Sequence, residues 1–426
     1  MTATAPATPT AWSSRRFRGF WYAQTISQFG DRISEIALPL LAVTMLAASP
    51  GEVGLLTALI WLPYLFGVFV GAWVDRHGHR RRLLIIADLI RAVVLLTLPV
   101  AYLLDLVTLP HLFAVVLLTG VGALLFSMAY PSFFVTLVPS HAYVDANSRL
   151  SLSRAGSFVA GPAVGGALVQ VLTAPVALVA DALSFLGSAL LLHRIPDAAS
   201  EPTPRTPDPA ATSPDLGAFR RIREGLTLLL RHRVLRAVLA CTTTVNLFTF
   251  IAGTLVILFA SRELGLSAGA IGIAFGAGAV GGLAGAALAP RVTRAIGLGR
   301  TAIIGVVLFP APLALMALAG GTVPAKVALL AVAEFVSSAG VMLMDINLNA
   351  LITKVTPDHA RARIAGAYST VNYGIRPLGA LIGGWLGTAI GLRPTLALAG
   401  TAGVCAAFWL LASPVRRVST LDAETP

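Results

Sequence analysis

Long runs of apolar residues follow one another along the chain, separated by short polar turns. A helix needs about 20 apolar residues to cross the roughly 30 Å hydrocarbon core of a bilayer. We therefore expect two sets of six membrane-spanning helices. The first set lies at about 20–46, 53–74, 83–104, 111–137, 147–172 and 175–193, and the second at about 234–260, 268–289, 301–320, 325–350, 362–390 and 395–413.

A polar segment of different composition separates the two sets. Six prolines lie between residues 196 and 214, which is typical of an extended linker. Asp215 is then expected to cap an amphipathic helix whose apolar residues, from Leu216 to Leu229, recur every three or four positions. Its arginines lie off that stripe, so we expect the helix to rest on the inner leaflet of the membrane. The alternative is a solvated connector.

This pattern predicts an all-α membrane protein of 12 transmembrane helices in two pseudo-symmetric six-helix bundles, a recurring design in secondary transporters. The repeat is visible when Pro162 is matched with Pro377. The same shift matches Asp75, at the end of the second span, with Pro290, at the end of the eighth. The predicted parts are an N-terminal tail (1–18), a first bundle (19–195), a linker with its amphipathic helix (196–233), a second bundle (234–414) and a C-terminal tail (415–426).

The composition supports a membrane protein. Apolar residues make up 56% of the 426 residues and charged residues 12%, about half of what a soluble domain carries. A soluble enzyme and a disordered chain are therefore excluded. The net charge of +12 is explained by basic cytoplasmic loops rather than by a nucleic acid partner.

The basic residues also indicate the orientation. With the N-terminus inside, the inside segments hold basic clusters at 15–18, 76–82, 220–236 and 291–300, while the outside turns hold only Arg262, Lys326 and Arg393. We expect a multi-pass protein of a bacterial inner or plasma membrane, with both termini cytoplasmic. Cys241 and Cys405 lie within apolar runs and fit neither a disulfide framework nor a metal site.

The most informative motif is the turn between the second and third spans, G71-A-W-V-D-R-H-G-H-R-R-R82. It resembles the G-x-x-x-D-R-x-G-R-R signature of the major facilitator superfamily, in which this turn acts as a latch between the bundles. The resemblance assigns this role to Gly71, Asp75, Arg76, Gly78 and Arg80. It implies that Asp75 binds the N-terminal end of the eleventh span, where free N–H groups favour an anion. Gly71 would allow a close helix approach and Gly78 a tight turn.

A second motif lies in the fifth span, where Gly161, Pro162, Gly165 and Gly166 resemble the G-P-x-x-G-G element of the antiporter branches of that superfamily. This element favours export over import, although ordinary small-residue packing would also explain it. Gly30-Asp31 in the first span and the segment Met344–Asn347 in the tenth look like the macrolide-efflux type of drug:proton antiporter. The fourth span, however, lacks the arginine of better-known drug antiporters.

Ionisable residues within predicted spans mark candidate functional groups. All seven histidines fall at span ends or in loops, so a carboxyl group has to carry any coupling proton. Asp31 and Glu35 are the first choices because they are four residues apart on one helix face, and Asp345 is a further candidate. Structural ion pairing remains the alternative for several of these charges. The other charges predicted within spans are Arg32, Asp88, Arg91, Asp181, Glu334 and Arg376.

Mid-span aromatic and polar side chains are candidates for a substrate cavity: Gln28, Tyr64, Asn246, Phe250 and Tyr373. We expect a proton-coupled exporter of amphipathic small molecules that works by alternating access, as a monomer in contact with lipid and without a cofactor or metal. The alternatives are an importer or a lysolipid flippase of the same fold, or a receptor or scaffold. No nucleophile motif or buried histidine supports an intramembrane enzyme.

Overall fold

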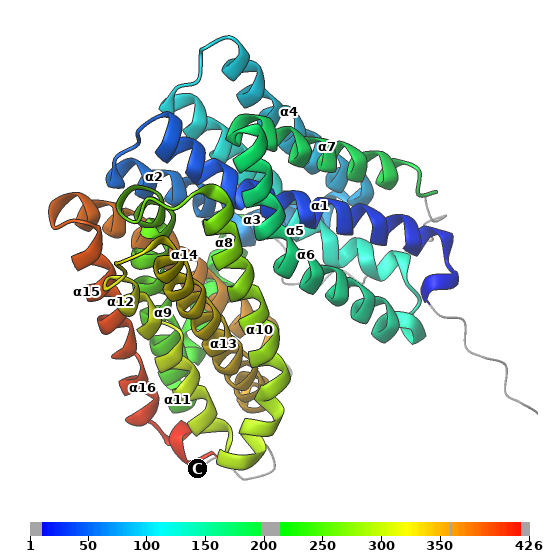
Figure 1. The fold of residues 1–426 in the computed structure, drawn as a ribbon. Coiled ribbons are helices and arrows are strands. Elements are labelled where there is room, and N and C mark those ends of the chain that lie inside the picture. The colour runs from blue at the N-terminus through cyan, green and yellow to red at the C-terminus, as the bar shows by residue number, and fades with distance from the viewer. Residues whose placement is uncertain (1–10, 197–213, 358–359, 419–426) are drawn as a thin grey trace, which may run out of the picture.

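The computed structural model describes residues 11–196, 214–357 and 360–418, and no strand occurs within these ranges. The helices form two bundles that meet at an angle (Figure 1). We define the terminal side as the side on which α1 (Arg15–Leu40) begins and the last helical turn (Pro414–Arg417) ends, and we call the other side the opposite side. On the terminal side the bundles diverge, and on the opposite side they converge (Figure 1).

Each bundle contains six helical segments long enough to cross a membrane. The first bundle holds α1 (Arg15–Leu40), α2 (Pro50–Trp61) continued by η3 (Leu62–Phe66) and α3 (Gly67–His77), α4 (Arg80–Leu103), α5 (Leu109–Leu137), α6 (Tyr143–Leu172) and α7 (Ala174–His193). The second holds α9 (Arg233–Leu258), α10 (Ala268–Ile296), α11 (Leu298–Leu308) with α12 (Ala311–Met316), α13 (Val323–Val355), α14 (Arg361–Ala389), and α15 (Leu392–Val404) with α16 (Ala407–Leu411).

Ten of these segments within the described ranges are apolar enough to cross a membrane by length and composition. The two others are α1 and α14, which are 26 and 29 residues long. Both carry several charged residues along their length, and this lowers their mean hydropathy. Charged residues in a span are tolerated where they face a cavity, so these two helices are expected to contribute to the interior between the bundles.

The two bundles repeat each other in a register that differs from the one expected from the prolines. Ser49 caps α2 and Ser267 caps α10. When these two serines are matched, the π-helical turn at Leu41–Met45 falls on the one at Phe259–Glu263, and the first residues of α6 and α14 also coincide. The expected alignment of Asp75 with Pro290 was therefore wrong by three residues, and Asp75 corresponds to Thr293.

Two pairs of glycines bring the bundles together on the opposite side. A methyl group added to Gly166 of α6 would lie 2.6 Å from the Ala268 carbonyl oxygen and 2.9 Å from the Cα of Gly272 in α10. A methyl group on Gly54 of α2 would lie 2.7 Å from the Ala380 carbonyl oxygen and 2.8 Å from the Cα of Gly384 in α14. The register of the serine caps matches Gly54 with Gly272 and Gly166 with Gly384. The bundles are thus closed on this side by a two-fold symmetric backbone contact.

The amphipathic helix of the linker forms as expected, as α8 (Pro214–Arg231). Leu229 is fully buried in a cluster with Leu235 of α9 and Ile364 of α14, and Gly225 approaches the backbone of Arg363. This part of the apolar stripe therefore contacts protein, and contact of the helix with the membrane surface stays a prediction. The side chain of Asp215, the predicted cap, lies outside the described residues.

Candidate functional site

A cavity of about 740 Å³ lies between the two bundles. Its walls come from α1, α2, η3, α4 and α5 of the first bundle and from α9, α10, α12 and α13 of the second. On α1 the lining residues run from Gln24 to Pro39, so this helix follows the cavity for much of its length. The volume is in the range of pockets for drug-sized molecules.

Three of the five predicted cavity residues line this space, namely Gln28, Tyr64 and Phe250. The other two, Asn246 and Tyr373, are not part of the lining. The Asn246 amide donates to the Oδ1 atom of Asn372 at 3.1 Å, and the Tyr373 ring contacts those of Trp61 and Tyr64. The cavity wall is thus mixed, with aromatic rings next to polar and charged groups.

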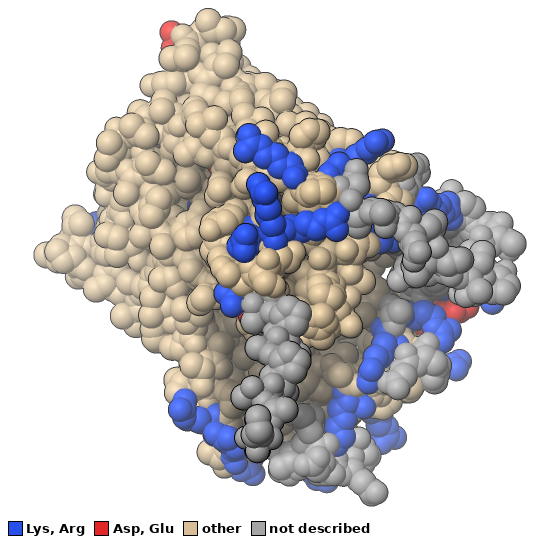
Figure 2. All heavy atoms as spheres, turned by 90° about the vertical axis from the view of Figure 1, so that its right-hand side faces the viewer, with Lys and Arg blue, Asp and Glu red and all other residues tan. Residues whose placement is uncertain are grey.

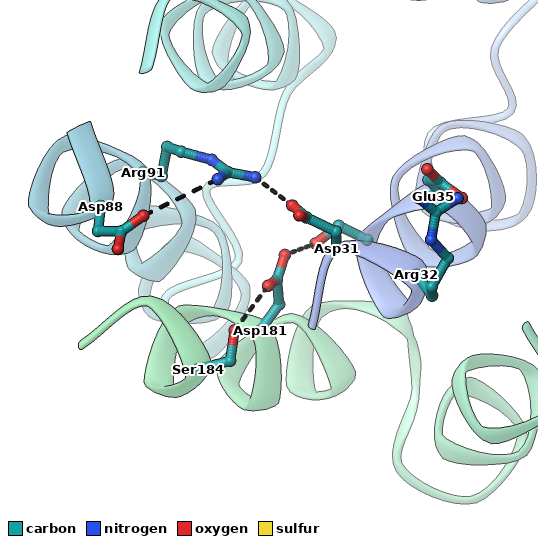
Figure 3. Close-up of polar contacts among 8 residues, drawn as sticks. Asp31, Arg32, Glu35, Asp88, Arg91, Asp181 and Ser184 are labelled. Atoms are coloured by element: carbon teal, nitrogen blue, oxygen red, sulfur yellow. Dashed lines mark hydrogen bonds and ion pairs between the residues drawn. The ribbon is translucent and has the colours of Figure 1, made fainter. Parts of the chain in front are cut away.

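The strongest polar cluster of the described residues surrounds the guanidinium of Arg91 on α4. Arg91 donates a hydrogen bond to Asp31 of α1 and lies 4.0 Å from the carboxylate of Asp88, one turn earlier on its own helix. The guanidinium also lies over the Phe185 ring, 3.7 Å from its centre. Figure 3 shows Asp31 of α1 converging with Asp88 and Arg91 of α4, next to Asp181 and Ser184 of α7. Asp88 is fully buried.

A third carboxyl group, Asp181 of α7, completes this cluster. It accepts hydrogen bonds from Ser34 and from Ser184, at 3.1 Å, and it is almost fully buried. Gly30 makes this approach possible, because a methyl group at that position would overlap the Asp181 carboxylate and the Ser184 hydroxyl. The sequence places Asp181 within a predicted span and assigns it no role. The feature that could have identified it is a mid-span carboxyl group with a serine one turn later.

Glu35, the other predicted proton carrier, pairs instead with Arg32 on the same helix. The Arg32 guanidinium donates to the Glu35 carboxylate at 2.6 Å (Figure 3) and lies 4.0 Å from the centre of the Phe158 ring. Asp31 and Glu35 both line the cavity, as their spacing predicts. Their partners differ, because Asp31 contacts Arg91 and Glu35 contacts Arg32.

Two candidate charges of the second bundle, Arg376 and Asp345, lie outside the cavity lining. The guanidinium of Arg376 is enclosed by three aromatic rings, 4.3 Å from the centre of Trp61, 4.5 Å from Tyr373 and 5.1 Å from Phe250. Its Nε atom is buried without a hydrogen-bond partner among the described residues. Trp61 belongs to the first bundle, so this cation–π cluster bridges the two bundles.

The latch motif is only partly described. Gly78 ends α3 with a left-handed backbone, φ 61°, as a tight turn requires. Arg80 donates to the Ser132 carbonyl oxygen at 3.4 Å, and Arg76 is exposed. Among the described residues, a methyl group on Gly71 would meet only the Met128 sulfur, at 3.4 Å, so the expected close backbone approach is absent there. The side chain of Asp75 lies outside the described residues, and its bond to the eleventh span stays a prediction.

The glycine-proline element of α6 packs on two different helices. A methyl group on Gly161 would overlap the side chain of Arg32, and one on Gly165 would lie 3.0 Å from the Cα of Ile33. Gly166, as described above, contacts α10, and the Pro162 carbonyl oxygen lies against Gly272. The element therefore fixes α6 against α1 and, across the bundle interface, against α10.

The described residues contain no group of three histidine, cysteine or carboxyl side chains that could hold a metal ion. The described histidines lie at helix ends or in turns, as predicted, and His359 lies outside the described residues. The site's chemistry is thus that of carboxylates, arginines and aromatic rings around an open space.

A two-bundle helical membrane protein with a charged central cavity has the architecture of a secondary transporter. The comparisons agree, because the family model described as "Major Facilitator Superfamily" matches residues 20–380 and 238–425. The chain belongs to the major facilitator superfamily, and it is a multi-pass membrane transporter, not an enzyme.

Curated relatives cover most of the chain. It is 28% identical over 399 residues to the "Multidrug efflux pump Tap" of Mycobacterium tuberculosis, with 89% of this chain and 88% of the relative covered. It is 27% identical over 395 residues to the "Uncharacterized MFS-type transporter YfiS" of Bacillus subtilis, with the same coverage.

Solved structures share the fold at low sequence identity. A bacterial homologue of the iron transporter ferroportin in an inward-facing state aligns with a TM-score of 0.74 at 15% identity, over 93% of this chain and 98% of the other. A D-xylose–proton symporter aligns with a TM-score of 0.68 at 17% identity, over 96% and 99%. These two structures support the fold and leave the substrate and direction of transport open.

Proposed function

We propose that this protein is a proton-coupled exporter of amphipathic small molecules that works by alternating access. The observation that carries the proposal is the cluster of three carboxyl groups, Asp31, Asp88 and Asp181, around the single guanidinium of Arg91 at the cavity wall. Three carboxylates and one guanidinium leave an excess of two negative charges in a buried place. An uncompensated buried charge is costly, so the cluster favours binding at least one proton.

The same cluster is linked to the cavity and therefore to the conformational change. Asp31 lines the cavity, whereas Asp88 and Asp181 lie behind it. A substrate that enters the cavity changes the surroundings of Asp31 and thereby the pairing of Arg91. Proton release and substrate binding then favour different arrangements of one network, which is the requirement for coupling.

Export is proposed as the direction because of the likeness to a multidrug efflux pump along 89% of the chain. The fold alone also serves a proton symporter. The glycine-proline element of α6, with its resemblance to antiporters, supports the same direction.

We further propose that the terminal side faces the cytoplasm of a cell membrane. Lys and Arg side chains far outnumber Asp and Glu on the face shown in Figure 2, which includes the start of α1 and the end of α7. This is the bias expected of cytoplasmic loops. The structure would then be inward-facing, with the cavity accessible from the cytoplasm and the glycine pairs closing the outside. The protein would act as a monomer. Its partners would be a small amphipathic substrate, protons and lipid, and nucleic acid would not be among them.

Transport into inverted membrane vesicles tests this proposal. Ethidium and a panel of antibiotics should accumulate only while a proton gradient is maintained, and a protonophore should abolish accumulation. Asp31→Asn and Glu35→Gln should each reach the membrane and lose gradient-driven accumulation, because each leaves an arginine of the cavity without its carboxylate partner. Gradient-driven transport at wild-type rates in both variants would assign the proton to another acid such as Asp345. Accumulation that a protonophore does not abolish would exclude proton coupling.

Asp105→Asn is the matched control for these variants. Asp105 is exposed in the turn after α4 and has a φ of 54°, a backbone conformation that asparagine also adopts. The Asp105→Asn substitution removes one carboxylate and leaves the cavity lining unchanged.

Accumulation in vesicles of the natural orientation but not in inverted vesicles would instead identify an importer.

A further inference from the structure

One carboxylate of the cavity, Glu334 of α13, takes no part in the network around Arg91. It lines the wall contributed by the second bundle. A methyl group on Gly278 of α10 would lie 3.1 Å from its Cβ atom, so the close contact of α10 and α13 fixes its backbone. Among the described residues, neither an ion pair nor a hydrogen bond involves the Glu334 carboxylate.

The charges of the cavity lining do not balance. Its ionisable residues other than tyrosine are Asp31, Arg32, Glu35, Arg91 and Glu334. Arg32 is bound to Glu35 and Arg91 to Asp31, so both arginines already have a carboxylate partner. Within this lining, the charge left without a partner is that of Glu334. The cavity therefore presents one carboxyl group without a partner, whose ionised form an entering cation would stabilise.

The remaining wall suits an organic cation. Six aromatic side chains line the cavity: Trp61, Tyr64, Phe126, Phe250, Phe275 and Phe309. Aromatic faces attract cations and also bind apolar groups. A carboxylate in such a wall binds a single positive charge, while the rings accommodate its apolar substituents.

We propose that Glu334 is the substrate-binding carboxylate of this cavity and that the preferred substrates are monovalent organic cations with aromatic or other apolar substituents. This inference rests on the proposed function and adds the charge of the substrate. It places the substrate charge on the second bundle and the proton site on the first. Closure of the bundles would therefore bring the two charged sites toward each other.

Binding to the purified full-length protein in detergent tests the inference without requiring transport. Tetraphenylphosphonium and tetraphenylborate are matched probes, because they have the same shape and opposite charge. Quenching of tryptophan fluorescence reports binding, since Trp61 lines the cavity. The wild-type protein should prefer the phosphonium. Glu334→Gln should weaken phosphonium binding by about tenfold or more and leave borate binding unchanged or stronger, and Glu334→Asp should keep the preference for the cation.

Glu263→Gln is the matched control. Glu263 pairs with Arg393 at 2.9 Å and does not line the cavity, so its loss should leave both affinities unchanged. Wild-type affinity for the phosphonium in Glu334→Gln would overturn the inference. Loss of phosphonium binding in Glu35→Gln but not in Glu334→Gln would also overturn the inference. Equal affinity of the wild-type protein for the two probes would overturn it as well.

A second measurement needs no variant. Dicyclohexylcarbodiimide modifies carboxyl groups in apolar surroundings, and peptide mass spectrometry identifies the modified residue. Saturating tetraphenylphosphonium should protect Glu334, whereas tetraphenylborate should not. Modification of Glu334 at the same rate with and without the phosphonium would refute the inference. Phosphonium binding without gradient-driven transport would instead contradict the proposed function and leave the site assignment intact.

Discussion

The glycine contact between α6 and α10 gives a sharp prediction about the conformational equilibrium. A methyl group at Gly166 would lie 2.6 Å from the Ala268 carbonyl oxygen, where ordinary contact begins at 3.4 Å. Gly166→Ala therefore forces the two backbones apart, because the 2.6 Å separation is 0.8 Å short of the 3.4 Å at which ordinary contact begins. Overpacking of this kind costs about 1–3 kcal/mol. Only the conformation closed on the opposite side incurs that cost, so its population relative to the alternative should fall about 5- to 150-fold.

Spin labels at positions 105 and 320 measure this shift, because both lie in exposed turns on the opposite side, one in each bundle. The labels require a background without Cys241 and Cys405, the described free cysteines. Double electron–electron resonance should show a longer distance for Gly166→Ala than for the unsubstituted protein. Gly54→Ala, at the symmetry-related contact, should have the same effect.

Gly156→Ala controls for the change in helix propensity. Gly156 lies on the same helix as Gly166, and a methyl group there would have no neighbour within 4 Å among the described residues. Alanine at that position should stabilise α6 slightly and leave the distance distribution unchanged. If Gly166→Ala and Gly156→Ala give the same distribution, the glycine contact does not control closure and the steric reasoning is wrong.

Three further predictions concern other parts of the molecule. Gly30→Ala should lower thermal stability by about 1–3 kcal/mol in a melting assay, because its methyl group overlaps Asp181; an unchanged melting temperature would contradict the packing. Asp75→Asn should favour the conformation open on the terminal side by roughly 1.5–3 kcal/mol, seen as greater cysteine accessibility there; identical accessibility would mean that Asp75 is only a solvated charge. Hydrogen bonds from Arg220 and Arg363 hold the pKa of Glu224 below its ordinary value of 4.5, so the contact of α8 with α14 should persist at neutral pH and weaken on acidification through that lowered pKa. Hydrogen exchange in α8 measures it, and a Glu224→Gln variant should have lost the pH dependence.

The arrangement of helices was predictable because hydropathy is a local property of the sequence. The spans and the two halves follow from runs of apolar residues, and the family's turn motif added the fold. The register of the repeat was not predictable in this way. Matching Pro162 with Pro377 suggested one register, whereas the glycine contacts and helix caps follow another that is shifted by nearly one helical turn. A proline can move by one turn along a helix and keep the same face, so it is a poor marker of register.

The pairing of charges was beyond the sequence for a different reason. Asp31 is next to Arg32 in the chain, but adjacent helical residues point in different directions. Asp31 instead reaches Arg91, far along the chain on another helix, and Arg32 turns to Glu35. Which charges meet depends on the rotation of each helix in its bundle. Asp181 joined the cluster for the same reason, through the approach that Gly30 allows.

The symmetry of the glycine contacts bears on the ancestry of the fold. In each half, the second helix carries a glycine of one inter-bundle contact and the fifth helix carries a glycine of the other contact. In the first half these glycines are Gly54 and Gly166. Each half is therefore complementary to a copy of itself, which is the definition of an isologous surface. Two identical six-helix chains could form this interface as a homodimer. The halves differ in their charged groups, because the carboxyl cluster around Arg91 belongs to the first half whereas the aromatic enclosure of Arg376 draws on both.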